Sequence, residues 1–540
     1  MPREKASPVS QERLLAFLLK PHSYPRRPRR VRLIQTHASY LLIVVPYVYK
    51  VKKPVNLGFL DFSTLKKRRY FSEREVMLNR RLCPAMYLGV VPISSHAGSL
   101  AFGPGVQVVE YAVKMRKLQD RYFMLSLLKR KQVGTNDLDE IISTLKAFYE
   151  EEAPTAEVIA WGRVEKLKIS TDENFHQTEN FIGITISPPA FETIRLYTSN
   201  FYLHHDELFE SRIREQRIRD CHGDLHLDHI HLSPKTLSIY DCIEFNDRFR
   251  YIDVANDVAF LAMDFDYHAR PDLCRYFTAQ IAEALGDRGM LRLMDFYKCY
   301  RAYVRGKVES FRQCETQVSD SERTKSQRRA QRYFQLALQY AVCGSEPMLV
   351  IVMGRVGSGK STLARRLGRE LGWEVLSSDY TRKQLARVPL HKRGGQAMRR
   401  RIYSEAMTRR TYYTLLRHAL GRIKERRSLI LDATFSRRHH RDELRRRLDR
   451  AGETYCFVEA RATAEVLKKR LAEREGKTQE VSDARLEDFE ALNRSYEAPS
   501  ELGALHLVTV STECPLEATI VKTLQALMQC RTAEPARAHA

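Results

Sequence analysis

The sequence lacks the cysteine spacing and the long apolar runs that define several common classes of protein. Its ten cysteines stand singly, without the paired spacing of a zinc site or a redox dithiol, which is typical of a reducing compartment. The longest apolar run, YLLIVVPYVY at residues 40–49, contains a proline and is far shorter than the roughly 20 residues that span a bilayer. LLAFLL at residues 14–19 is too short for a secretory core and has no small-residue cleavage site, so a short amphipathic helix is expected there. The sequence therefore predicts a soluble, cytoplasmic protein without membrane contact.

Nucleic-acid-binding motifs are missing as well, although the chain is strongly basic. No zinc-finger, homeodomain or aromatic RNA-binding motif accompanies the formal net charge of +24. The densest patches are residues 25–32 and 437–450. The second has helical spacing with acids mixed in, which is typical of a solvated helix face. A net positive charge favours phosphates, nucleic acid or acidic surfaces as partners, and nucleic acid stays open as a partner without being favoured.

The 540 residues exceed one ordinary core, so at least two domains are expected. Strand-like runs surround one helix at residues 71–82, and the following segment is mostly helical apart from a hairpin turning at residues 233–236. After residue 346 strands and helices alternate, which predicts a parallel sheet wrapped by helices. The predicted segments are a basic extension (1–30), a first domain (31–315), a helical linker (316–346), a second domain (347–530) and a disordered tail (531–540).

A glycine-rich loop, GRVGSGKST, lies between the apolar run MLVIVM and the helical pattern LARRLGREL. It satisfies G-x-x-x-x-G-K-[ST], a pattern whose glycines allow backbone amides to point at a phosphate chain. Lys360 is expected to reach the outer phosphates, and Ser361 to offer its hydroxyl to Mg²⁺. Asp432, which ends the strand LILDATF, is the expected second residue for the metal. The predicted nucleotide-binding residues are Gly354, Arg355, Val356, Gly357, Ser358, Gly359, Lys360, Ser361 and Thr362.

The stretch SSDYTRKQLA, residues 377–386, follows the second strand of this segment. The segment resembles the small P-loop kinases that phosphorylate hydroxyls, such as gluconate kinase-like enzymes, the kinase half of polynucleotide kinase, and zeta toxins. The resemblance implies that Asp379 activates an acceptor hydroxyl and that Arg382 orients the substrate, which agrees with the need to remove a proton and to balance charge. LKKRLAEREGK, residues 467–477, looks like the lid of that family, with Arg470 and Arg474 one turn apart and able to reach the γ-phosphate.

HGDLHLDH, residues 222–229, has the spacing of a protein-kinase catalytic loop, with Asp224 at the position of the base. Its glycine makes it look like the aminoglycoside phosphotransferase branch. That resemblance implies Asp241 as a metal ligand after the hairpin, Lys50 as the phosphate-binding lysine with Glu75 as its partner, residues 108–115 as the hinge strand, and Asp257 as a brace for the loop. Lys52 and Lys53 compete with Lys50 for this role.

Two features of the first domain depart from the family pattern. His229 replaces an asparagine metal ligand, and imidazole is a poor match for Mg²⁺, which prefers oxygen; Asp228 is an alternative ligand. The stretch QTHASYLLIV, where a phosphate-covering loop is expected, contains no glycine.

As a whole the chain resembles a bacterial two-domain protein, in which an aminoglycoside phosphotransferase-like domain with a bilobal protein-kinase-like fold is fused to a P-loop kinase-like domain of the AAA type. The expected fold class is α+β followed by α/β. The expected function is transfer of the γ-phosphate of Mg-ATP to a hydroxyl-bearing small molecule, with ATP and Mg²⁺ as cofactors and the second site the active one. Two alternatives remain: an ATP-dependent regulator without turnover, and a nucleic-acid 5′-hydroxyl kinase.

Overall fold

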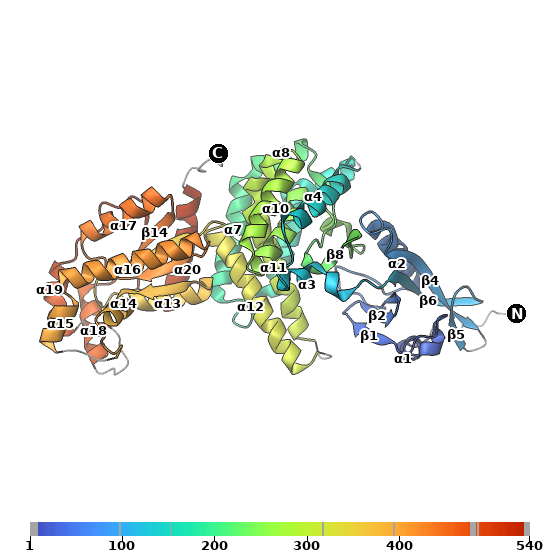
Figure 1. Ribbon diagram of the computed structural model, residues 1–540, viewed down its shortest axis with the longest axis horizontal. Coiled ribbons are helices and arrows are strands. Elements are labelled where there is room, and N and C mark those ends of the chain that lie inside the picture. The colour runs from blue at the N-terminus through green and yellow to red at the C-terminus, as the bar shows by residue number, and fades with distance from the viewer. Residues whose placement is uncertain are drawn as a thin grey trace. The chain divides into compact units, whose positions relative to one another are not determined.

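The computed structural model of the chain describes residues 9–96, 99–151, 153–315, 318–391, 395–475, 482 and 485–533. The chain divides into two compact units, and Figure 1 labels many of their elements. Unit 1 consists of Met1–Ile169 and Asp206–Tyr297, and unit 2 of Ser170–His205 and Lys298–Ala540. Residues 170–205 and 298–346 therefore group with the second predicted domain and not with the first domain or a linker. The division into 31–315, 316–346 and 347–530 stays a prediction about folding units.

Unit 1 contains a short helix, α1 (Gln11–Leu18), at the amphipathic stretch that the sequence indicates, and an antiparallel sheet. The strand order is β1-β2-β3-β6-β4-β5. The run at residues 32–44 forms two strands because Thr36 and Ser39 exchange backbone and side-chain hydrogen bonds in a turn. The bounds are β1 Arg32–Gln35, β2 Ser39–Val44, β3 Tyr47–Lys52, β4 Tyr87–His96, β5 Ser99–Phe102 and β6 Gln107–Arg116.

Helix α2 (Leu65–Asn79) packs against β4 and β6, and it begins six residues before the predicted start. The cause is Thr64, whose hydroxyl accepts from the Lys67 amide at 3.2 Å and caps the helix. The helical part of unit 1 surrounds α9, which is buried along almost its whole length. Its helices are α3 Met124–Lys129, α4 Thr135–Glu150, α5 Ala156–Ile159, α6 Val164–Thr178 (which ends in unit 2), α8 Asp206–Arg214, α9 Val254–Tyr267, α10 Pro271–Ala284 and α11 Met294–Gln313 (which also ends in unit 2).

Two small antiparallel pairs carry the loop HGDLHLDH within unit 1. Strand β7 (Ile218–Asp220) pairs with β10 (Tyr251–Asp253) before the loop. Strands β8 (Ile230–Ser233) and β9 (Thr236–Ile239) form the predicted hairpin after it. The loop is therefore held at both ends by strand pairing.

Unit 2 is built on a parallel sheet with strand order β12-β13-β11-β14-β15, and this confirms the predicted parallel sheet. The central strand β11 is buried at every position, as expected for a strand covered on both faces. The carboxyl ends of parallel strands meet at one edge of the sheet, where α/β domains bind ligands. The bounds are β11 Met348–Met353, β12 Glu374–Ser377, β13 Leu429–Asp432, β14 Thr454–Arg461 and β15 Leu507–Ser511.

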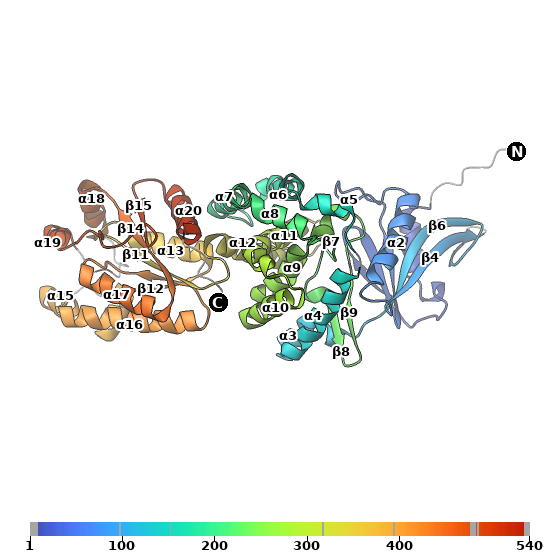
Figure 2. The ribbon, with the colours of Figure 1, turned by 90° about the horizontal axis from the view of Figure 1, so that it is seen from above.

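Helices cover both faces of this sheet, with α16 and α17 on one face and α13 and α20 on the other (Figure 2). In the part of the chain that the structure describes, no helix combines the length and apolar character needed to cross a bilayer. The helices of unit 2 are α7 Pro188–His204, α12 Asp320–Val342, α13 Lys360–Leu371, α14 Ser378–Leu385, α15 Gln396–Ile402, α16 Glu405–Lys424, α17 Arg438–Ala451, α18 Ala464–Glu475, α19 Phe489–Arg494 and α20 Leu516–Ala533.

Candidate active site

The loop between β11 and α13 needs glycine at three positions. Gly354, Gly357 and Gly359 have φ angles of 144°, 82° and 82°, which side chains rarely allow. A Cβ on Gly354 would lie 2.4 Å from the Ala460 carbonyl oxygen, and one on Gly357 would lie 3.0 Å from the Leu467 carbonyl oxygen. The loop thus turns tightly under neighbouring backbone before it enters α13. A helix N-terminus reached through such a turn attracts phosphate.

Lys360, Ser361 and Asp432 meet at the mouth of this loop. The Ser361 hydroxyl donates to Asp432 Oδ1 at 3.1 Å. Burial raises the pKa of Asp432, while Lys360 and the bond from Ser361 act against that rise. Burial lowers the pKa of Lys360, and Asp432 and Asp379 oppose the shift. A hydroxyl and a desolvated carboxylate are oxygen ligands of the kind that Mg²⁺ takes, so these residues fit the metal.

Asp379 lies in the first turn of α14, directly after β12. Since β12 and β13 are neighbouring parallel strands, their carboxyl ends bring Asp379 to the same edge as Asp432. The negative charge of Asp379 adds to the rise in the pKa of Asp432, and both carboxylates act to raise the pKa of Lys360. The Tyr403 hydroxyl lies 3.5 Å from Asp379 Oδ1. The position of Asp379 is suited to a group that accepts a proton beside the phosphate loop, and its role stays a prediction.

Arg382 is buried, with 5% of its surface exposed. Its Nη1 donates to the Ile402 carbonyl at 3.2 Å and to the Thr408 hydroxyl at 2.9 Å, and its guanidinium lies 4.5 Å from the centre of the Tyr403 ring. Arg382 therefore ties α14 to the end of α15 and the start of α16. A role in orienting the substrate would act through these helices.

Arg470 is held against the phosphate loop by a residue that the sequence reasoning missed. Its Nη1 and Nη2 donate to the Thr512 hydroxyl at 2.9 Å and the Thr512 carbonyl at 2.6 Å. The Thr512 hydroxyl in turn donates to the Ser358 carbonyl at 2.7 Å. Thr512 follows β15 at the carboxyl edge of the sheet, and only that topology could have indicated it. Arg474 lies near enough for its charge to lower the pKa of Lys360; the last predicted lid residues, 476 and 477, lie outside the described residues.

A pocket of about 370 Å³ opens beside Arg355, the second residue of the loop. The Tyr496 hydroxyl donates to Glu459 Oε1 at 2.8 Å, and the Arg355 guanidinium lies 5.4 Å from the centre of the Tyr496 ring. Glu459 lies in the buried run of β14, one residue before its end. Neither Glu459 nor Tyr496 belongs to a motif, so sequence reasoning gave no reason to select them.

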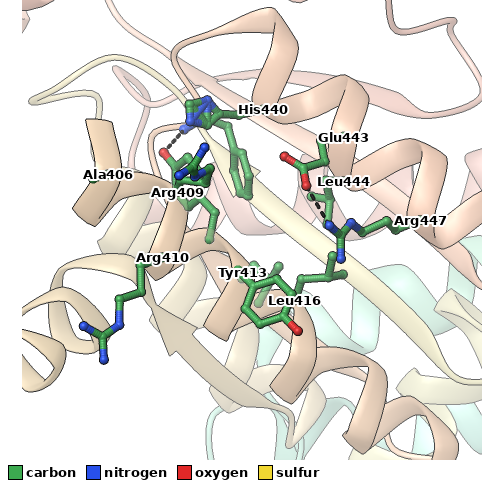
Figure 3. Close-up of a pocket in the computed structure, with 12 residues that line it drawn as sticks. Ala406, Arg409, Arg410, Tyr413, Leu416, His440, Glu443, Leu444 and Arg447 are labelled. Atoms are coloured by element: carbon green, nitrogen blue, oxygen red, sulfur yellow. Dashed lines mark hydrogen bonds and ion pairs between the residues drawn. The ribbon is translucent and has the colours of Figure 1, made fainter. Parts of the chain in front are cut away.

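A second pocket, of about 440 Å³, lies between α16 and α17 and is shown in Figure 3. Tyr412 stacks on Phe435, with ring centres 4.6 Å apart, and its hydroxyl accepts from the Phe435 amide at 3.3 Å. His440 lies near Arg409, while Arg447 pairs with Glu443 at 2.8 Å farther along α17. Burial raises the pKa of Tyr412, on which Arg382 and Asp379 also act. Tyr412 thus connects this pocket to the neighbourhood of Asp379.

In unit 1 the residues predicted for a second phosphate site also come together. Asp257 accepts from the amides of His222 and Gly223, each at 2.9 Å, and from the Tyr149 hydroxyl at 2.9 Å. The carboxylate thus braces the loop before Asp224. A Cβ on Gly223, whose φ is 84°, would lie 2.6 Å from the Phe249 carbonyl oxygen.

Lys50 contacts Glu75, its predicted partner, and also Asp241, the predicted metal ligand. Its Nζ lies 2.9 Å from Glu75 Oε1 and 3.0 Å from Asp241 Oδ1. Burial alone would lower the pKa of Lys50, but Asp241 and Glu75 raise it well above its usual value. Lys52 points to the same side of β3 and binds Glu75 at 2.7 Å, whereas Lys53 donates to the Thr36 carbonyl.

Asp224, His226 and His229 lie beside this pair. Each offers one potential metal-binding atom, and these atoms lie within 4.8 Å of one another. His229 Nε2 lies 3.5 Å from Asp241 Oδ2, and Asp224 Oδ2 lies 3.4 Å from His229 Nδ1. Asp241 has a φ of 64°, a conformation that a residue other than glycine adopts at a cost and that often marks functional sites.

The buried strand, the glycine-rich loop entering a helix, and the aspartate on the adjacent strand define a P-loop nucleotide-binding domain in unit 2. A family model described as an AAA domain matches residues 349–499. Over the longer chain, uncharacterized protein Rv2004c of Mycobacterium tuberculosis and uncharacterized protein Mb2027c of Mycobacterium bovis are each 32% identical over 445 residues, which cover 82% of this chain and 86% of the relative. The chain therefore belongs to the family of these mycobacterial proteins.

Solved structures also resemble part of the chain. A gluconokinase from Sinorhizobium meliloti is 19% identical with a TM-score of 0.26. The match covers 35% of this chain and 94% of the gluconokinase. The APS kinase of Mycobacterium tuberculosis is 18% identical with a TM-score of 0.25. The match covers 34% of this chain and 98% of the APS kinase. At scores this far below 0.5 the likeness says nothing about activity.

Proposed function

We propose that unit 2 is an ATP-dependent phosphotransferase that moves the γ-phosphate to a hydroxyl of a small molecule. The observation that carries the proposal is the meeting of Lys360, Ser361, Asp432 and Asp379 at one edge of the parallel sheet. This edge combines a phosphate-binding loop with a second carboxylate, Asp379, which we assign as the proton acceptor. A regulatory P-loop domain needs the loop but has no need of Asp379.

The proposed roles follow from position and charge. The loop from Gly354 to Thr362 and Lys360 bind the phosphates, and Ser361 and Asp432 would hold Mg²⁺. When bound, Mg²⁺ would offset the charge of the phosphate oxygens. The acceptor oxygen bonds to the γ-phosphorus as the bond to the β-phosphate oxygen breaks, ADP leaves, and the hydroxyl proton passes to Asp379. Arg470 and Arg474 supply positive charge beside the loop once Arg470 leaves Thr512.

The groove between α16 and α17 is the proposed seat of the rest of the acceptor. It has a volume suited to a small molecule, and Tyr412 links it to Asp379. Its lining residues include three arginines, Arg409, Arg410 and Arg447, and one acidic residue, Glu443. An acceptor with a carboxylate or a phosphate of its own matches this excess of positive charge.

In unit 1 we propose a protein-kinase-like fold of the aminoglycoside phosphotransferase type with a second nucleotide site. The antiparallel sheet with α2, the Lys50–Glu75 pair and the loop braced by Asp257 support it. Asp224 would be the base and Asp241 a metal ligand there. A cytoplasmic location is part of the same proposal.

Transfer of labelled γ-phosphate from ATP into a metabolite extract and into oligonucleotides tests the function. We expect label to appear in a small molecule. Asp379→Asn should lower the rate of labelling about 10²- to 10⁴-fold, whereas Asp224→Asn should leave that rate unchanged. ATP binding by Asp379→Asn should equal that of the parent. Label in oligonucleotides that declines steeply with salt would favour a nucleic-acid kinase instead. No labelled product from the parent in any arm would leave the regulatory alternative.

A further inference from the structure

The site around His229 in unit 1 has the wrong chemistry for Mg²⁺. Mg²⁺ demands oxygen ligands in near-octahedral geometry and gives up water reluctantly. Here an imidazole nitrogen, His229 Nε2, faces the free carboxylate oxygen of Asp241 at 3.5 Å. Imidazole suits transition cations, whose affinity for nitrogen ligands is higher.

We propose that His229 and Asp241 form a binding site for a divalent transition cation such as Mn²⁺, Co²⁺ or Zn²⁺, in preference to Mg²⁺. The separation is appropriate, since two atoms bound to one such cation at about 2.1 Å in tetrahedral geometry lie about 3.4 Å apart. The proposal deepens the role suggested for Asp241 and does not depend on phosphate transfer by unit 2.

The hydrogen bonds around His229 leave the required nitrogen available. Its Nδ1 lies 3.0 Å from the Asp224 carbonyl oxygen, an acceptor, which favours the neutral tautomer with the proton on Nδ1 and the lone pair on Nε2. A backbone carbonyl that accepts from the second nitrogen is the usual support of a metal-binding histidine. The ring is also packed against His226, with centres 4.0 Å apart, which limits its rotation.

Asp241 is also held by a neighbour through one atom, so that its other oxygen faces the site. Lys50 binds Oδ1 at 3.0 Å, so Oδ2 is left to face His229. The ammonium charge of Lys50 is itself matched by Glu75 at 2.9 Å. The side chain of Asp241 is 41% exposed and that of His229 is 14% exposed, so a cation and its remaining water or phosphate ligands can enter from solvent.

Electron paramagnetic resonance of Mn²⁺ in the full chain tests the site directly. The chain carries Asp432→Asn in all samples, so that a cation at the P-loop does not contribute. We expect one tightly held Mn²⁺ and, in electron spin-echo modulation, the ¹⁴N signal of a bound imidazole. His229→Asn should abolish the ¹⁴N signal and weaken binding by at least about ten-fold. It should also lower the preference for Mn²⁺ over Mg²⁺ in competition.

His176→Asn is the matched control, because His176 is 83% exposed on α6; it should leave both signals unchanged. If His229→Asn does not fold, Asp241→Asn replaces it, with the ¹⁴N signal retained and affinity reduced by a similar factor. Failure of the parent to hold Mn²⁺, or a ¹⁴N signal that persists in His229→Asn, would overturn the proposal. Either result is independent of whether unit 2 transfers phosphate.

Discussion

In unit 2 the conformation of the phosphate loop depends mainly on backbone φ angles. In unit 1 the residues of the candidate phosphate site are held mainly by ion pairs between side chains. The loop from Gly354 to Ser361 depends on three glycines with positive φ and on one buried acid, Asp432. Unit 1 instead joins Lys50 to Glu75 and Asp241. Backbone geometry is written in a short stretch of sequence, whereas an ion network draws on strands and loops far apart in the chain. The difference explains why the spacing of one short stretch predicted the first site, whereas Lys50, Glu75 and Asp241 were named only through a resemblance to a known family.

The largest expected effect is on Mg-ATP binding, and it distinguishes a glycine of the phosphate loop from an exposed glycine in a helix of unit 2. Gly354→Ala should abolish Mg-ATP binding, because its Cβ would lie 2.4 Å from the Ala460 carbonyl oxygen and its φ is 144°. Gly421 lies in α16 with nothing within 4 Å of a Cβ. Gly421→Ala should therefore keep ATP binding and gain roughly 0.5–1 kcal/mol of stability. Calorimetry with Mg-ATP and thermal unfolding of both variants measure this, and equal behaviour of the two would contradict it.

Next in size is the contrast between two buried arginines. In unit 1, Arg212 binds Asp253 at 2.8 Å and Asp287 at 2.7 Å, and removing one partner of a buried ion network costs about 3–5 kcal/mol. Arg382 in unit 2 donates to neutral oxygens of Ile402 and Thr408, and the loss of such bonds costs about 1–3 kcal/mol.

Urea unfolding of Arg212→Met and Arg382→Met measures the difference. Arg382→Met should in addition raise KM for the acceptor more than it lowers ATP affinity, since α14 carries Asp379. A larger loss of stability with Arg382→Met than with Arg212→Met would reverse the comparison between the units.

The Mg-ATP affinity of lysine variants shows which unit binds the nucleotide. Lys360→Ala should weaken Mg-ATP binding by about 100-fold, the worth of about two charge-assisted hydrogen bonds to phosphate. Lys424, exposed at the end of α16, provides the control, and Lys424→Ala should bind as the parent does. Calorimetric titration decides between them. Loss of the tight site with Lys50→Ala, and not with Lys360→Ala, would assign it to unit 1.

The smallest effect is a pH dependence at the groove of Figure 3. Burial and the neighbouring His439 lower the pKa of His440 to about 4, against Glu443 and Glu405, which raise it. A depressed pKa means that stability is fully present above the ordinary value of 6.5 and is lost as the pH falls towards 4. His440→Phe should flatten that part of the stability curve of unit 2. His418→Gln, at an exposed position of α16, should leave the curve unchanged.

Much of the P-loop site could be predicted because its parts lie within short stretches. The buried strand, the glycine pattern and Lys360 are contiguous, Asp432 ends a recognisable strand, and Asp379 closely follows another. Thr512, Glu459 and Tyr496 could not be predicted, because each reaches the site only through the order of strands in the sheet. The start of α2 was missed since Thr64 as a cap is a weak local signal. The predicted division into domains differs from the two compact units, because helical periodicity does not tell which core a helix joins.

By itself the sequence determined the phosphate loop, the parallel sheet of unit 2 and the residue types at both sites, because backbone conformation and side-chain chemistry are local properties. Only the tertiary structure decided that Lys50 meets Asp241 in addition to its expected partner Glu75, that Nε2 of His229 faces a carboxylate, and that Arg382 is held by α16. These relations depend on distances between segments many residues apart, which packing sets and no spacing in the chain records.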